Sequence, residues 1–282
     1  MCDVNNNTQL PDYDRPPVVE VILGVQFEHL PKFKNAHLGS FWNSLDNDKW
    51  CIIEDAPFLP PQFERFEDTA QWHDGLQLRL KREAACRLQI RNSLQDRMIQ
   101  VQNSRFHFNW LGKSGGKYIR YQEVFKEFDS SLEQFRHFLR EGDIGDIQPN
   151  QWEITYVNHI PCGSVWSNPE DWGFFKLIRP PDISEELAVS ESFEGNWHFV
   201  IPPQKGRLHI HWQHVVGASA NGQEEEFIRL VSTARGVIES ESSVFESVTN
   251  GLALGRRVIV SSFKELMSNK ANQYWGLKND NT

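Results

Sequence analysis

The stretch from residue 121 to residue 140 limits most strongly what this chain can fold into. Its apolar residues recur every three or four positions, with charged residues between them: Tyr121, Val124, Phe125, Phe128, Leu132, Phe135, Phe138 and Leu139. This spacing predicts a helix with one strongly aromatic face, ended by Gly142. Such a face must be buried against another element, and the flanking sequence offers a β-sheet.

Segments on both sides of this helix have the alternating or β-branched pattern of antiparallel strands. Before it, the pattern predicts strands over 18–27, 76–81, 86–92 and 97–110, and a short helix over 38–45. After it, the pattern predicts strands over 151–160, 186–193, 197–201, 207–216 and 227–235, and a longer helix over 243–267. Gly251 and Gly255 are expected to let that helix approach the sheet closely, although each costs about 1 kcal/mol of helix propensity relative to alanine.

The order of elements repeats, which predicts an α+β protein of two similar halves, each an antiparallel β-sheet packed against a long amphipathic helix. The halves are placed at residues 15–148 and 149–277. Residues 1–14 and 278–282 are polar and are predicted to be disordered tails. One continuous α+β domain with a larger sheet fits the same pattern equally well.

Several features of the sequence favour a cytoplasmic location for the protein. The cysteines are widely spaced, so they form no Cys-x-x-Cys pair; they are Cys2, Cys51, Cys86 and Cys162. The N-terminus has no basic start followed by an apolar stretch, which a secretory signal would need. No apolar run reaches the length of about 18 residues that a membrane-spanning helix requires. We therefore predict a cytoplasmic protein that has no membrane partner.

Four segments, in this order, resemble a sporadically distributed, uncharacterised bacterial protein family of about this length. They are the strand that begins Arg15, Pro16, Pro17, the region from Phe106 through Trp110 to Tyr121, the strand over 152–160, and the closing stretch over 263–275. The resemblance implies a cytosolic protein of bacterial or phage origin with a patchy distribution, as seen for mobile, defence or toxin–antitoxin genes. It supplies no catalytic residues.

Local motifs do not identify a reaction. The Gly- and Lys-rich stretch over 112–117 fails as a phosphate-binding loop, because His107 stands where that motif requires glycine. Alternation places His209 and His211 on one strand face and His214 on the other, but no zinc motif completes the set. We therefore predict no catalytic residues, no bound metal and no cofactor.

Charge is strongly segregated along the chain. The protein carries a net charge of −9, yet residues 76–120 contain ten basic and two acidic residues and so carry +8. Alternation places Arg87, Gln89 and Arg91 on one face of a strand. The predicted partner-binding residues of the first half are Arg79, Lys81, Arg87, Arg91, Arg97 and Arg105.

An open sheet face rich in arginine can bind carboxylates or phosphates. We expect an acidic protein partner more than nucleic acid, because few aromatic side chains are available on this face for base stacking. The predicted function is that of a non-enzymatic interaction or regulatory protein of a bacterial operon, of defence or toxin–antitoxin type. Two alternatives stay open. The face is only solvated and is neutralised by acidic residues such as those over 64–68 or by the second half, or the protein is a small-ligand-binding protein or enzyme with a site between sheet and helix.

Overall fold

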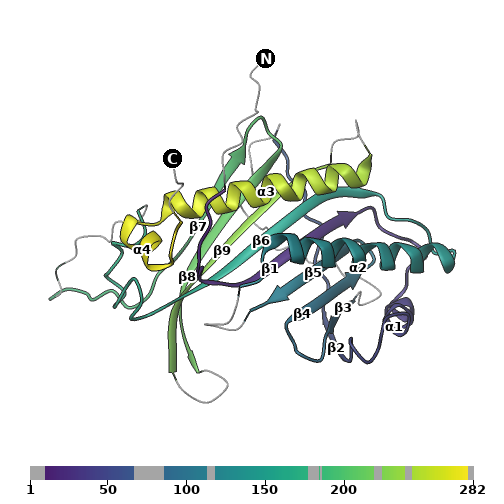
Figure 1. Cartoon of the computed structure of the whole chain (residues 1–282), viewed down its shortest axis with the longest axis horizontal. Helices are drawn as coiled ribbons and strands as arrows, with labels where there is room; N and C mark the ends of the chain where they lie inside the picture. The colour runs from purple at the N-terminus through teal and green to yellow at the C-terminus, as the bar shows by residue number, and fades with distance from the viewer. Residues whose placement is uncertain are drawn as a thin grey trace.

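The computed structural model describes residues 10–66, 86–112, 118–176, 184, 186–218, 224–238 and 243–278. Over these residues, nine strands form one antiparallel sheet in the order β2-β3-β4-β5-β1-β6-β9-β8-β7 (Figure 1). Strands β1 (Val18–Phe27) and β6 (Pro149–Pro161) pair with each other at its centre. The α+β class is confirmed. The predicted boundary at residue 149 falls at the start of β6, so the two halves share one continuous sheet.

The other elements follow the predicted order. The remaining strands are β2 (Ile52–Pro57), β3 (Cys86–Arg91), β4 (Arg97–Gln102), β5 (Arg105–Leu111), β7 (Glu194–Ile201), β8 (Gly206–Ala218) and β9 (Glu224–Val237). The helices are α1 (Asn35–Asn43), α2 (Tyr121–Glu141), α3 (Val244–Leu266) and α4 (Asn269–Tyr274). Both long helices are confirmed to within a residue of the predicted ends.

Alternation along the central strands gives the sheet one apolar and one polar face. Leu23 of β1 pairs with Phe108 of β5 and Ile154 of β6, so these side chains point to the same side. The long helices α2 and α3 lie across this apolar side (Figure 1). The next residue, Gly24, pairs with His107 and Glu153, whose side chains therefore point to the opposite, polar face.

The aromatic face of α2 covers the first half of the sheet, as predicted. Phe135 is fully buried at its centre. The ring centroids of Phe41, Phe106 and Phe33 lie 5.1, 5.5 and 5.8 Å from that of Phe135. This single side chain therefore joins α1, α2 and β5 in one core.

The second long helix, α3, approaches β6 closely because two glycines face the strand. A Cβ atom on Gly251 would lie 2.2 Å from Cδ1 of Trp152, and one on Gly255 would lie 2.5 Å from Cγ2 of Ile154. Both distances are far below van der Waals contact. The close approach expected from these glycines is confirmed.

Replacing Gly251 with alanine is expected to destabilise the protein by about 1–3 kcal/mol, because the added methyl group overlaps the buried Trp152 ring. Alanine favours helix by about 1 kcal/mol over glycine, which offsets only part of this loss. Gly39→Ala is the matched control, since nothing lies within 4 Å of the added atom. We expect it to stabilise α1 slightly. Urea unfolding measures both variants, and equal stabilisation of both would contradict the tight contact at Gly251.

The structure corrects the predicted N-terminal tail for residues 10–14. Tyr13 is buried, and its hydroxyl donates a 2.7 Å hydrogen bond to Oδ1 of Asn272. Asp12 forms ion pairs with Arg120 and with Lys278, the first residue of the predicted C-terminal tail. These residues lack apolar periodicity, so only their long-range contacts show that they belong to the fold.

Some strand predictions also need correction. Residues 97–110 form two strands, β4 and β5, separated by a turn. Residues 186–193 form no strand among those described, and the predicted strand over 76–81 lies outside the described residues. Two elements, β2 and α4, are not predicted from the sequence pattern. β2 carries two charged residues and a proline, and α4 has only six residues, so neither leaves a clear periodic pattern.

Candidate functional site

Three of the six basic residues predicted to bind a partner share the polar face. Arg87 and Arg91 lie on one side of β3, as predicted, and Arg105 lies on the same side of β5. Arg79 and Lys81 lie outside the described residues.

The polar-face arginines already have partners within the chain. Arg91 forms a 3.1 Å ion pair with Glu54 of β2. Arg87 donates a 2.7 Å hydrogen bond to Gln100 of β4. Arg105 is buried, so it is not exposed in the way that the sequence suggested.

The structure corrects the placement of Arg97, which lies on the apolar side. It pairs with Trp110 across β4 and β5, so its side chain points toward α2. There its guanidinium donates hydrogen bonds of 2.8 and 2.9 Å to the two carboxylate oxygens of Glu127. Arg97 therefore anchors α2 to the sheet. The alternation was misassigned because the turn between β4 and β5 was not predicted.

An extended segment of the chain itself, residues 58–66, lies over the polar face; we call it the crossing segment. It has no regular secondary structure. Its contacts begin on β4 and β5 and continue over β1 and β6 to β8 and β9. The chain thus runs across the strands rather than alongside one of them.

The first part of the crossing segment is held by side chains that bind its main chain. The side-chain amide of Gln102 on β4 binds both main-chain polar groups of Leu59. Its Oε1 accepts from the Leu59 N–H at 3.0 Å, and its Nε2 donates to the Leu59 carbonyl at 2.8 Å. Arg105 of β5 donates to the Pro60 carbonyl at 3.3 Å.

Two further glutamines continue this pattern. Gln26 of β1 accepts from the N–H of Gln62 at 2.9 Å. Gln151 of β6 donates to the Gln62 carbonyl and accepts from the N–H of Glu64 at 3.3 Å. We call Gln102, Gln26 and Gln151 the glutamine row. Because it contacts peptide groups, it recognises an extended main chain with little regard to side-chain identity.

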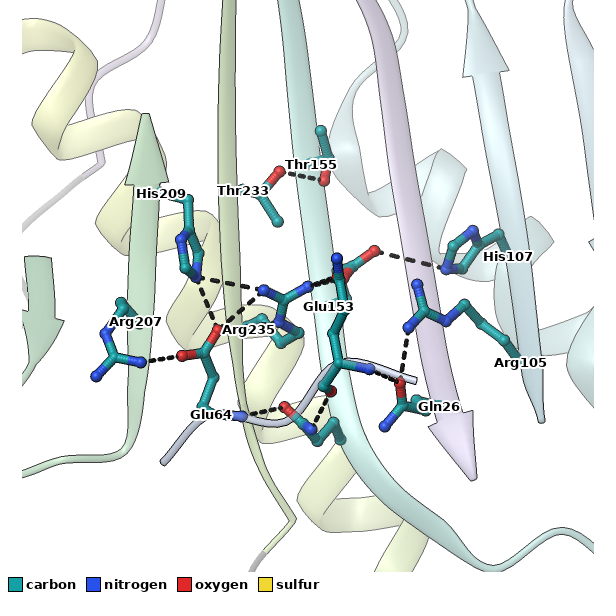
Figure 2. Close-up of polar contacts among 12 residues, drawn as sticks. Gln26, Glu64, Arg105, His107, Glu153, Thr155, Arg207, His209, Thr233 and Arg235 are labelled. Atoms are coloured by element: carbon teal, nitrogen blue, oxygen red, sulfur yellow. Dashed lines mark hydrogen bonds and ion pairs between the residues drawn. The ribbon is translucent and has the colours of Figure 1, made fainter. Parts of the chain in front are cut away.

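The carboxylate of Glu64 is buried in a basic cluster on the second half of the sheet (Figure 2). Its Oε1 lies 2.7 Å from Nε2 of His209 and 3.0 Å from Nε of Arg235, and its Oε2 accepts from Arg207. Burial acts to raise the pKa of Glu64, but the hydrogen bond from His209 and the charge of Arg235 outweigh it and lower the pKa to about 2. We call Arg207, His209 and Arg235 the carboxylate cluster.

A second, largely buried carboxylate, that of Glu153, extends this cluster toward β5 (Figure 2). Arg235 also donates to Oε2 of Glu153 at 2.9 Å, and Nε2 of His107 lies 3.5 Å from Oε1 of Glu153. The His107 ring reaches Glu153 over Gly24, where a Cβ would lie 2.5 Å from Cδ2 of the ring. Burial lowers the pKa of His107 to about 4, so this histidine is neutral at pH 7.

The predicted faces of the three histidines are confirmed. His209 and His211 point to the polar face, where His209 contacts Glu64 and His211 lies 2.9 Å from Oδ1 of Asn196. His214 packs on the other side, against Trp166. Within the part of the chain that the structure describes, no group of three or more His, Cys, Asp or Glu side chains is placed to hold a metal ion.

Sequence reasoning missed the glutamine row and most of the carboxylate cluster. Glu64 does lie on the polar face, but its basic partners are on β8 and β9 and not among the basic residues of the first half that it was expected to neutralise. The sequence signal for this cluster is the alternation of polar residues around Arg207 and His209 in β8. It places both side chains on the same face of the sheet as Arg235. Which carboxylate they would hold is not encoded locally.

No protein-family model matches this chain, and no curated protein shows significant sequence similarity to it. None of the helices described here is both long and apolar enough to cross a membrane. The geometry of the polar face is therefore the main guide to function.

Proposed function

We propose that this is a cytoplasmic protein-interaction protein whose polar sheet face recognises an extended segment of an acidic protein partner, in the place where its own crossing segment lies. One observation carries the proposal. The glutamine row binds a main chain without reading its side chains, while the carboxylate cluster accepts one acidic side chain at a fixed distance along it.

The way in which the crossing segment is held supports exchange with a partner. Its hydrogen bonds to the sheet run to side chains of Gln102, Gln26 and Gln151 rather than to strand main chains. Every pairing of the nine-stranded sheet is made by other residues. A partner segment can therefore replace the crossing segment without breaking the sheet.

The crossing segment also sets the affinity that a partner must reach in order to bind. A tethered segment competes at an effective concentration of roughly millimolar, so a partner must bind tightly or be abundant to displace it. This behaviour suits a regulatory interaction. The resemblance in sequence adds the expectation that the partner is encoded in the same operon, of defence or toxin–antitoxin type.

A fluorescent peptide with the sequence of residues 58–66 tests this proposal in trans. We expect it to bind the full-length Glu64→Gln variant, whose own segment lacks the carboxylate, at least ten-fold more tightly than it binds the unmodified protein. The bound peptide should also raise the Tm of the variant, because it restores the missing charge. Fluorescence anisotropy and thermal unfolding measure the two effects.

Glu54→Gln is the matched control, since it removes a carboxylate from the same face outside the carboxylate cluster. This variant should bind the peptide as weakly as the unmodified protein. A peptide in which glutamine replaces the glutamate should lose at least ten-fold in affinity for Glu64→Gln. If the acidic peptide neither binds nor stabilises Glu64→Gln, the proposal is contradicted, and the crossing segment has only a structural role.

We also propose that residues 15–148 and 149–277 form a tandem structural repeat. The strand that precedes each long helix lies beside a central strand: β5 lies next to β1, and β9 lies next to β6. Moving outward, β4 and β3 in one half occupy the places of β8 and β7 in the other. Each half ends in a long helix on the apolar side (Figure 1), which supports the same interpretation.

A further inference from the structure

A cavity of about 320 Å³ lies on the helix side of the sheet, opposite the carboxylate cluster. Its floor includes Val18 of β1 and Tyr156 of β6, and α3 forms one wall. Residues 10–13, which pack against the fold, line another side. The volume is within the range of pockets that hold small organic ligands, which starts at about 300 Å³.

The most informative side chain in the cavity is Tyr156. It is only 4% exposed, and no hydrogen bond of good geometry reaches its hydroxyl, although the hydroxyl of Tyr118 lies close enough to interact with it. Buried hydroxyl groups nearly always have a partner, because leaving one unsatisfied costs about 1–3 kcal/mol. The Tyr156 hydroxyl lines a cavity with only a poorly aligned neighbour, so it is available to a ligand group.

Arg256 of α3 supplies a positive charge to the same cavity. Its guanidinium lies over the Tyr121 ring, 4.7 Å from the centroid. No carboxylate of the described residues forms an ion pair with it. The other arginine of the lining, Arg120, is by contrast neutralised by Asp12.

The tyrosines remain hydrogen-bond donors at physiological pH. Burial raises the pKa of Tyr121 to about 12 and raises the pKa values of Tyr118 and Tyr156 as well. Neutral phenols, together with a guanidinium that forms no ion pair within the described residues, give the cavity a chemistry suited to an anion. Ile259, Val260 and Phe263 of α3 give the rest of the lining an apolar character.

We infer that this cavity binds a small organic anion, with a carboxylate or similar oxyanion group directed to Arg256 and the Tyr156 hydroxyl and an apolar body along α3. Both features are needed: the charge selects the anionic group, and the apolar wall selects the body. The site lies on the other face of the sheet from the crossing segment, so the inference stands independently of the proposed partner binding.

The probe 8-anilino-1-naphthalenesulfonate combines an aromatic body with one anionic group and tests this inference by fluorescence titration of the full chain. We expect saturable binding that octanoate displaces and the uncharged octanol does not. Arg256→Gln should weaken binding at least ten-fold. Arg257→Gln is the matched control, because it removes the same charge from the exposed neighbouring position on α3 and should leave the affinity unchanged.

Tyr156→Phe provides a second variant that removes only this buried hydroxyl. It should fold with a loss of about 1 kcal/mol or less, since the only protein interaction removed is the poorly aligned one with Tyr118, while the affinity for the probe falls several-fold. The inference is overturned if the probe does not bind, if octanol displaces it as well as octanoate does, or if Arg256→Gln and Arg257→Gln bind it equally well.

Discussion

Replacing Glu64 with glutamine should lower the free energy of unfolding by about 3–5 kcal/mol at pH 7, the usual effect of removing one partner from a buried ion pair. Glu64 is only 7% exposed, and it is held by Arg207, His209 and Arg235. Without its charge, two buried guanidinium groups lose an acceptor that water cannot easily replace. Urea unfolding followed by tryptophan fluorescence measures the loss.

Glu54→Gln separates this effect from the loss of any carboxylate on the polar face. The Glu54 side chain is 53% exposed and pairs with Arg91, so we expect a change of about 1 kcal/mol or less. If Glu64→Gln lowered the free energy of unfolding by as little as Glu54→Gln does, the crossing segment would have to leave the face readily and admit water to the arginines. That result would contradict the buried cluster as the main anchor of the segment.

The pH dependence of the same interaction follows from the pKa of Glu64. The folded-state pKa is about 2, below the ordinary value of 4.5, so the unfolded chain binds a proton more readily. The stabilisation is fully present above pH 4.5 and is lost as the pH falls toward 2. The stability difference between the unmodified protein and Glu64→Gln should therefore narrow over this interval. A difference that stayed constant would show that Glu64 is not ionised in the folded protein.

Phe135→Ala is the second substitution with a large expected effect, about 3–5 kcal/mol of lost stability. The Phe135 ring is fully buried and packs against Phe33, Phe41 and Phe106, so its removal opens a cavity between two helices and the sheet. The surrounding rings are fixed by their own strands and helices and cannot close this space completely. Chemical unfolding measures the loss directly.

Phe125→Ala is the control on the same helix. Phe125 is only partly buried, and its nearest aromatic neighbours, Tyr121 and Phe128, belong to α2 itself. We expect a loss smaller by at least 1 kcal/mol, because less apolar surface is removed from the core. Equal losses would mean that helix propensity, rather than packing across the sheet, dominates the contribution of α2.

Helix α2 shows what could be predicted from a local pattern. Its apolar positions recur with the helical period, and the structure places Val124, Phe128 and Phe135 in the core. The strands β1 and β6 are equally clear, because β-branched and aromatic residues are frequent in both. Local periodicity of this kind depends only on neighbouring residues, so one sequence is sufficient to predict it.

The functional residues were harder to predict for a specific reason. Alternation correctly placed Arg87, Arg91 and His209 on one side of their strands. It could not show that Arg91 meets Glu54 or that His209 meets Glu64, 145 positions away in the chain. Arg97 was misplaced because a single unpredicted turn reversed the assigned face.

The sequence by itself determined the α+β class, the two long helices and, within strands whose ends were predicted correctly, which side chains share a face, because each follows from the spacing of residues close in the chain. Only the tertiary structure decided that one sheet joins both halves, that residues 58–66 lie across its polar face and that Tyr156 and Arg256 line one cavity. These features depend on contacts between residues far apart in sequence, and such contacts form only when strand order and helix placement bring the residues together.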